Sequence, residues 1–104
     1  MKYFFDKRSR YEKIIEFICI YKGVKRQDIF KILKDIECRY LLFLLLKRYN
    51  CIDQYMLNKD FYIEDSDINK YVNSAQKKML ANIRVRNMYF EAEGILEKCK
   101  KISK

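Results

Sequence analysis

Apolar residues recur along the first quarter of the chain with the period of an α-helix. One face of this stretch collects large apolar side chains: Tyr11, Ile14, Ile15 and Ile18. Ser9, followed three residues later by Glu12, has the form of a capping box and predicts that the helix begins there. Gly23 is suited to end it, because glycine readily adopts a left-handed conformation. A second, brief helix is expected over residues 27–33.

Residues 38–49 show no such period, because apolar side chains occur on every face. Positions 40–46 are all apolar or aromatic, and none of them is β-branched. This composition favours a helix over a strand. A helix that is apolar all round is wrapped by lipid or by its own domain. A membrane span needs about 20 apolar residues, and this run covers only positions 40–46 between Arg39 and Lys47. We therefore predict a central buried helix over residues 36–49, capped by Asp35.

A short helix and a longer one are expected after the central helix. Asp53 can cap the first, and Asp65 or Ser66 can cap the second, which covers residues 66–80. The longer helix has one apolar face: Ile68, Tyr71, Val72, Ala75 and Met79. The tight connection between the two helices is the spacing of a helix-turn-helix, at about residues 53–80.

Asn82 can cap a last helix with a strong apolar stripe. The stripe consists of Val85, Met88, Tyr89, Ala92, Ile95, Leu96 and Cys99. Residues 1–104 are therefore expected to form a single all-α domain, a compact bundle of about six helices around the central buried helix. The absence of proline and the presence of only two glycines agree with an ordered chain without a flexible linker.

The residue types exclude several kinds of site. There is no histidine, which removes the usual Cys/His zinc patterns and catalysis by a Ser-His or Cys-His pair. The four cysteines are irregularly spaced: Cys19, Cys38, Cys51 and Cys99. We expect them to be buried thiols, with a cluster assembled only by the fold as the alternative. Neither a metal nor a cofactor is predicted.

The carboxylates do not form the pairs that acid–base catalysis needs. Asp65 and Asp67 are two positions apart, as are Glu91 and Glu93, so each pair points to different faces of a helix. We therefore predict that the protein is not an enzyme and has no small-molecule substrate. The amino end lacks the apolar core of a secretory signal, which predicts a cytoplasmic location, and no membrane association is expected.

Charge suggests an anionic partner, but its distribution is uneven. Lys and Arg number 23 against 14 Asp and Glu, a net charge of +9, which favours nucleic acid or another anionic surface. Residues 53–67 have the opposite balance. Their carboxylates, Asp53, Asp60, Glu64, Asp65 and Asp67, stand against Lys59 alone.

Several short sequence motifs follow one another along residues 23–65. Gly23-Val24-Lys25 precedes Asp28-Ile29-Phe30, Cys38-Arg39 leads into residues 41–46, and Met56-Leu57, Phe61 and Asp65 follow. In this layout the chain resembles the C-terminal DNA-binding domain of DnaA, the bacterial replication initiator, a trp-repressor-like helix-turn-helix domain. The resemblance covers about residues 14–79. It implies that Arg39 matches an arginine that contacts the DNA backbone.

The turn that reads bases in the DnaA domain differs in this chain. Tyr62 and Ile63 replace its two glycines, Glu64 replaces its arginine and Ser66 its histidine. The resemblance therefore does not imply the sequence specificity of DnaA. The phosphate-binding loop of an ATPase is also absent from the sequence, so replication initiation by this chain alone is not implied.

Double-stranded DNA is the predicted partner. The helix over residues 66–80 would lie in the major groove with its polar stripe, Ser66, Asn69, Lys70, Asn73 and Lys77, facing the bases. Arg39, Lys31 and Lys34 would contact backbone phosphates. A small regulator or an accessory replication or transcription factor would fit this description.

The acidic turn supports a second interpretation. Carboxylates beside the reading helix would repel phosphates at close range. The chain would then be a helical protein-interaction or regulatory module on a degenerate DNA-binding fold. Its aromatic amino end (Tyr3, Phe4 and Phe5) and its long last helix would bind a protein partner or form a homodimer.

Overall fold

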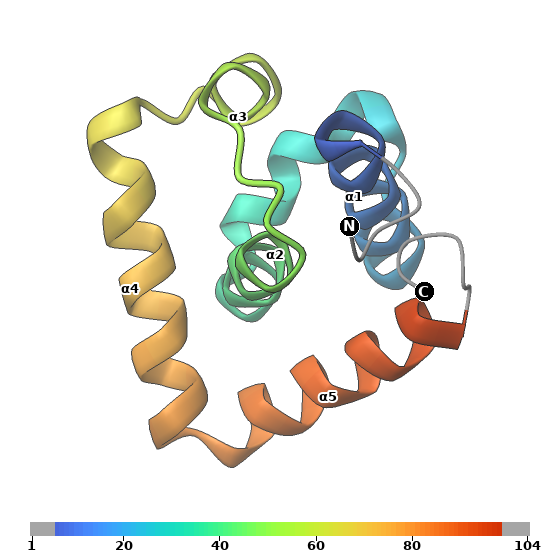
Figure 1. The fold of residues 1–104 in the computed structure, drawn as a ribbon, viewed down its shortest axis with the longest axis vertical. Helices are drawn as coiled ribbons and strands as arrows, with labels where there is room; N and C mark the ends of the chain where they lie inside the picture. The colour runs from blue at the N-terminus through green and yellow to red at the C-terminus, as the bar shows by residue number, and fades with distance from the viewer. Residues whose placement is uncertain (1–5, 99–104) are drawn as a thin grey trace.

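Five α-helices and one 3₁₀ helix make up residues 6–98, the part of the chain that the computed structural model describes (Figure 1). In chain order they are α1 (Lys7–Lys22), η1 (Arg26–Lys34), α2 (Ile36–Arg48), α3 (Gln54–Phe61), α4 (Asp65–Ala81) and α5 (Ile83–Lys98). The prediction of an all-α bundle of about six helices is confirmed. Tyr3, Phe4, Phe5 and Cys99, named in the sequence predictions, lie outside the described residues.

The central buried helix is α2. Residues 41–46 are all buried, and α1, α4, α5 and η1 pack around them. Figure 1 shows α2 end-on in the middle, with α4 and α5 along two edges. The side chain of Asp35 caps α2 by accepting a hydrogen bond of 3.1 Å from the backbone N–H of Cys38. No helix within residues 6–98 has the length and apolar character of a membrane span.

Arg10 is the one charged residue buried among residues 6–98, and it fastens α1 to the carboxyl end of α2. Its side chain is 4% exposed. Its Nε donates to the carbonyl oxygen of Tyr49 at 2.9 Å, and its Nη2 donates to that of Asn50 at 3.1 Å. Helix ends leave carbonyl groups without partners. Arg10 supplies two donors where the chain leaves α2, and so fixes the start of the path toward α3.

The boundary predictions are partly wrong. Asp6 caps α1, accepting from the backbone N–H of Ser9 at 2.8 Å, so the helix begins before the expected capping box. α4 begins at Asp65 after Glu64, and neither Asp65 nor Ser66 is its N-cap. Gly23 ends α1 with φ 76°, as predicted.

Two further helix caps are confirmed, and two other predictions of local structure are partly wrong. Asp53 and Asn82 cap α3 and α5 as expected. The brief second helix is present, but as η1, which is kinked at Asp28. Ile95, placed on the buried stripe of α5, is 46% exposed. Ile95 lies at the edge of the apolar stripe, where a side chain points partly to the core and partly to solvent.

Three residues join α3 to α4, and the first of them has an unusual backbone. Tyr62 adopts a left-handed conformation with φ 61°, and its side chain is 79% exposed. The Cβ atom makes this conformation costly, by about 1–2 kcal/mol for residues other than glycine. Its backbone N–H donates to the carbonyl of Asn58 at 2.9 Å, so the left-handed residue terminates α3 as glycine commonly does.

Replacing Arg10 tests the attachment of α1 to α2. We expect Arg10→Met to lower the free energy of unfolding by about 2–4 kcal/mol, because two carbonyl groups lose their donor. Urea unfolding measures the change. Arg8→Met, at an exposed position of the same helix, should change stability by less than about 0.5 kcal/mol. Equal effects of the two substitutions would contradict this role of Arg10.

Replacing Tyr62 tests the strain in the α3–α4 connection. Tyr62→Gly should raise the free energy of unfolding by about 1 kcal/mol, because glycine adopts a left-handed conformation without a Cβ clash. Thermal or urea unfolding reports the change. The control is Tyr55→Gly in the first turn of α3, which should lose about 0.5 kcal/mol through helix propensity. A loss of stability in both variants would show that Tyr62 is not strained.

Candidate nucleic-acid interface

The polar face of α4 points away from the core. Ile68, Val72 and Ala75 are buried, while Tyr71 and Met79 are partly buried against the core, which confirms the predicted apolar face. The predicted reading residues, Ser66, Asn69, Lys70, Asn73 and Lys77, are all exposed. Their spacing places them on one stripe opposite the buried side chains. The outer side of α4, the helix on the left of Figure 1, therefore carries these five polar side chains.

Charge changes sign along α4. Asp65 and Asp67 lie in its first turn, directly after Glu64, where negative charge is favourable for the helix dipole. Lys70 Nζ lies 3.6 Å from Asp67 Oδ1, and both side chains are exposed. Such surface pairs contribute little free energy, so Lys70 remains available to a ligand. Beyond Asp67, the charged residues of α4 are all lysines.

Arg39 lies beside α4, on its flank. Its guanidinium carbon is 5.3 Å from the ring centroid of Tyr71 and 5.7 Å from that of Tyr40. The Tyr71 ring is in turn stacked on Phe43, with centroids 5.1 Å apart and planes 7° apart. This cation–π arrangement joins the amino-terminal half of α2 to α4. Arg39 therefore has a fixed position next to the polar stripe but not within it.

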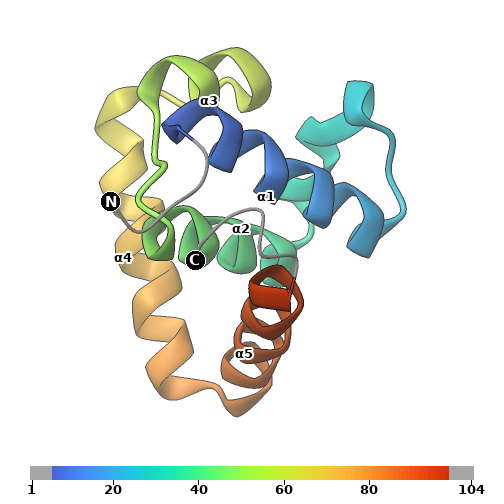
Figure 2. The same cartoon turned by 45° about the vertical axis from the view of Figure 1, so that its right-hand side comes forward.

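Lys31 and Lys34 lie away from the polar stripe. Both are exposed residues of η1, which packs against α1, α2 and α3. Figure 2 shows η1 in cyan on the side opposite to α4. Lys31 Nζ is also 4.0 Å from Asp28 Oδ2. The structure therefore does not bring these two lysines together with the residues of α4.

Two arginines just beyond the carboxyl end of α4 were not among the sequence predictions. Arg86 closes the carboxyl end of α4, donating from Nη2 to the carbonyl of Leu80 at 2.9 Å and from Nε to that of Met79 at 3.3 Å. Arg84 Nε lies 3.0 Å from Glu37 Oε2, with the arginine side chain 78% exposed. Their position just after the end of α4, where cations are favourable, was the signal that could have identified them.

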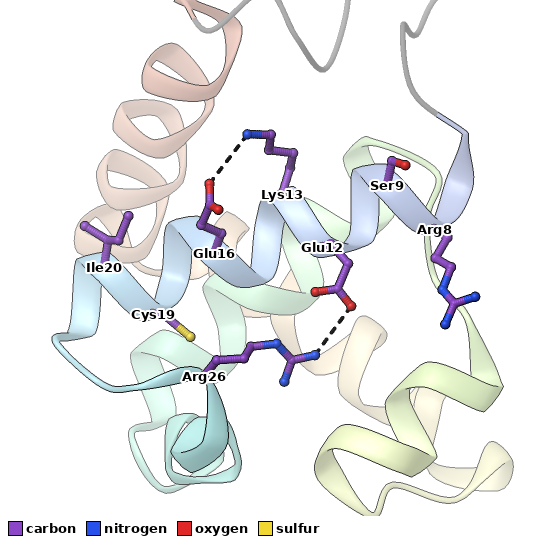
Figure 3. Close-up of a pocket in the computed structure, with 8 residues that line it drawn as sticks. All are labelled: Arg8, Ser9, Glu12, Lys13, Glu16, Cys19, Ile20 and Arg26. Carbon is purple, nitrogen blue, oxygen red and sulfur yellow. Dashed lines mark hydrogen bonds and ion pairs between the residues drawn. The ribbon is translucent and has the colours of Figure 1, made fainter.

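The hollow in Figure 3 lies between α1 and η1 and has a volume of about 660 Å³. Charged pairs line it: Glu12 is 3.4 Å from Arg26, and Lys13 is 3.5 Å from Glu16. Arg26 also lies 3.1 Å from Asp60. Its charge is therefore balanced by two carboxylates, and the second ion pair links η1 to α3. Nothing in this arrangement pairs a nucleophile with a base.

The cysteines of the described region are buried free thiols: Cys19, Cys38 and Cys51. Burial raises the pKa of Cys38 to about 11 and that of Cys51 to about 12. The reactive form of cysteine is the thiolate, so both side chains are chemically quiet near neutral pH. Residues 6–98 contain no group of three or more His, Cys, Asp or Glu side chains that could hold a metal ion.

Comparison with known proteins yields no relative for this chain. No protein-family model matches it, and no curated protein or solved structure matches it either. The resemblance to the DnaA domain therefore stays a prediction from short sequence motifs.

Proposed function

We propose that the protein is a non-catalytic, cytoplasmic protein that binds double-stranded DNA through the outer face of α4. The exposed polar stripe of this helix carries the proposal, because no contact with the core requires it. Asn69 and Asn73 can bond adenine edges, and Lys70 and Lys77 can reach guanine or phosphate. A three-residue connection between α3 and α4 is also the spacing of a helix-turn-helix.

The charge along α4 indicates which part of the helix would meet DNA. Glu64, Asp65 and Asp67 at the amino end repel phosphates at short range, where salt screens poorly. The three lysines of the helix follow these acids. We therefore place the duplex against the middle and the carboxyl half of α4, from Asn69 to Lys77. A DnaA-like docking on the first turn would be disfavoured by charge.

Arg39 would add a phosphate contact at the edge of this surface. Tyr71 holds its guanidinium beside α4, which lowers the entropy lost when a long side chain is fixed on a ligand. Lys31 and Lys34, on η1, would act only through the long-range attraction of a chain with net charge +9. The predicted set of phosphate contacts is thus reduced to Arg39.

A helical protein-interaction module is the second candidate, favoured by two exposed tyrosines. Tyr55 is 69% and Tyr62 79% exposed, and Tyr55 lines a shallow surface together with Glu64 and Asp65. Aromatic side chains beside carboxylates suit a basic protein surface. Under this alternative the protein would leave duplex DNA unbound even at low salt.

The salt dependence of DNA binding tests the assignment to α4. We expect Lys70→Gln combined with Lys77→Gln to weaken binding to random-sequence duplex DNA. The slope of log K against log salt concentration should become less steep by about 2, because two phosphate-neutralising charges are lost. Fluorescence anisotropy titrations at several salt concentrations give the slope.

The matched control removes two lysines on the other side of the molecule. Lys13→Gln with Lys25→Gln lowers the net charge equally but affects α1 and the segment before η1, and should leave the slope unchanged. Equal slopes in the two double variants would remove α4 from the interface. Failure of the unaltered protein to bind duplex DNA at low salt would reject DNA binding itself.

A further inference from the structure

The outer face of α5 carries apolar side chains that no part of the described chain covers. Ile83 is 65% and Phe90 52% exposed, and their spacing of seven residues places them on the same face. Asn87 and Gly94 share this face and are exposed. Figure 1 shows α5 along the lower edge of the molecule, with α2 on its inner side and α4 along the left edge. This face, Ile83, Asn87, Phe90 and Gly94, is called the α5 surface below.

Gly94 has no structural role within the described chain. A Cβ atom added at this position would meet nothing within 4 Å, and the residue lies inside α5. Glycine in the interior of an exposed helix is destabilising relative to alanine. A site that lets another backbone approach closely is one of the circumstances in which glycine is useful.

The charges of α5 oppose its own dipole. Arg84 and Arg86 lie near its amino end, where no acidic residue occupies the first turn. Glu91, Glu93 and Glu97 lie in its carboxyl half, where Lys98 in the last turn is the one residue of opposite sign. A helix dipole favours the reverse arrangement. A second α5 running antiparallel would place the acidic half of one helix beside the basic half of the other, and would align the two dipoles favourably.

We propose that the α5 surface pairs with the α5 surface of a second copy of this chain, the two helices lying antiparallel about a twofold axis. Such a symmetric contact places Phe90 of one copy against Asn87 of the other, and Ile83 against the open space at Gly94. Arg84, which helical spacing puts on the same flank of this face as Glu91, then lies beside Glu91 of the other copy. A self-complementary patch of this kind satisfies the requirement for a closed twofold dimer.

Contacts within the chain already engage most charges of α5. Glu93 is paired with Arg48, Glu97 accepts a hydrogen bond from Tyr49, and Arg86 binds the last carbonyl groups of α4. Arg84 is paired with Glu37, but its side chain is 78% exposed, and a surface pair of this kind costs little to exchange for Glu91 of the second copy. The pairing helix has 16 residues and is about 24 Å long. The contact is therefore smaller than a standard protein interface, and we expect a dissociation constant in the micromolar range or weaker.

Sedimentation velocity without DNA tests the dimer over concentrations from about 10 μM to about 1 mM. We expect a concentration-dependent shift from monomer to dimer. Phe90→Ser should raise the dissociation constant at least about tenfold, as loss of a central aromatic anchor does. Tyr55→Ser, which removes another exposed aromatic residue from α3, is the matched control and should leave association unchanged.

The variant Gly94→Leu distinguishes a loss of dimerisation from a loss of folding. Leucine fits the open space in the monomer and favours helix, so the melting temperature measured at low protein concentration should not fall. The same side chain would block the approach of Ile83 from the second copy and abolish the dimer. Raising salt from about 50 mM to about 500 mM should weaken association, because the facing charges are screened.

Three results would overturn the proposal. They are a protein that stays monomeric throughout the concentration range, a dimer that Phe90→Ser and Gly94→Leu leave intact, and association that strengthens with salt. Because DNA is absent from these measurements, none of the results bears on whether α4 binds DNA.

Discussion

Burial of α2 on every side is the constraint on which the other helices depend. Side chains at positions 41–46 are all buried, none more than 6% exposed, and each helix packed around them contributes an apolar stripe while leaving its polar side outward. Arg10 then fixes the exit from α2 through two carbonyl groups, which sets where α3 begins and, three residues after α3, where α4 begins. The exposed face of α4 is thus a consequence of the way its inner face covers α2.

Much of this fold could be predicted from periodicity and caps. Asp35, Asp53 and Gly23 mark boundaries because their local hydrogen bonds need only neighbouring residues. Arg10 could not be predicted, since its partners are about 40 residues away and an arginine in a polar stretch is ordinarily exposed. The left-handed Tyr62 was also missed, because tyrosine gives no sign of a conformation that normally favours glycine.

In the candidate site, too, features set by one segment could be predicted from the sequence, while contacts between distant segments could not. The stripe from Ser66 to Lys77 follows from the helical period of one segment, so the sequence was sufficient. Lys31 and Lys34 were grouped with it only by charge, and the packing of η1 on α1, α2 and α3 separates them. Arg39 is brought to the flank of α4 by Tyr71, a tertiary contact that periodicity alone does not specify.

Acidic and basic charge are separated along α4, and this separation shapes the functional proposal more than the net charge does. Carboxylates at the amino end stabilise the helix, and the lysines beyond them leave a surface that can attract phosphate. The most direct measurement is a backbone-amide NMR titration with random-sequence duplex DNA at low salt. We expect the largest chemical-shift changes at Asn69, Asn73 and Lys77. Changes confined to other helices, or none at all, would contradict binding through α4.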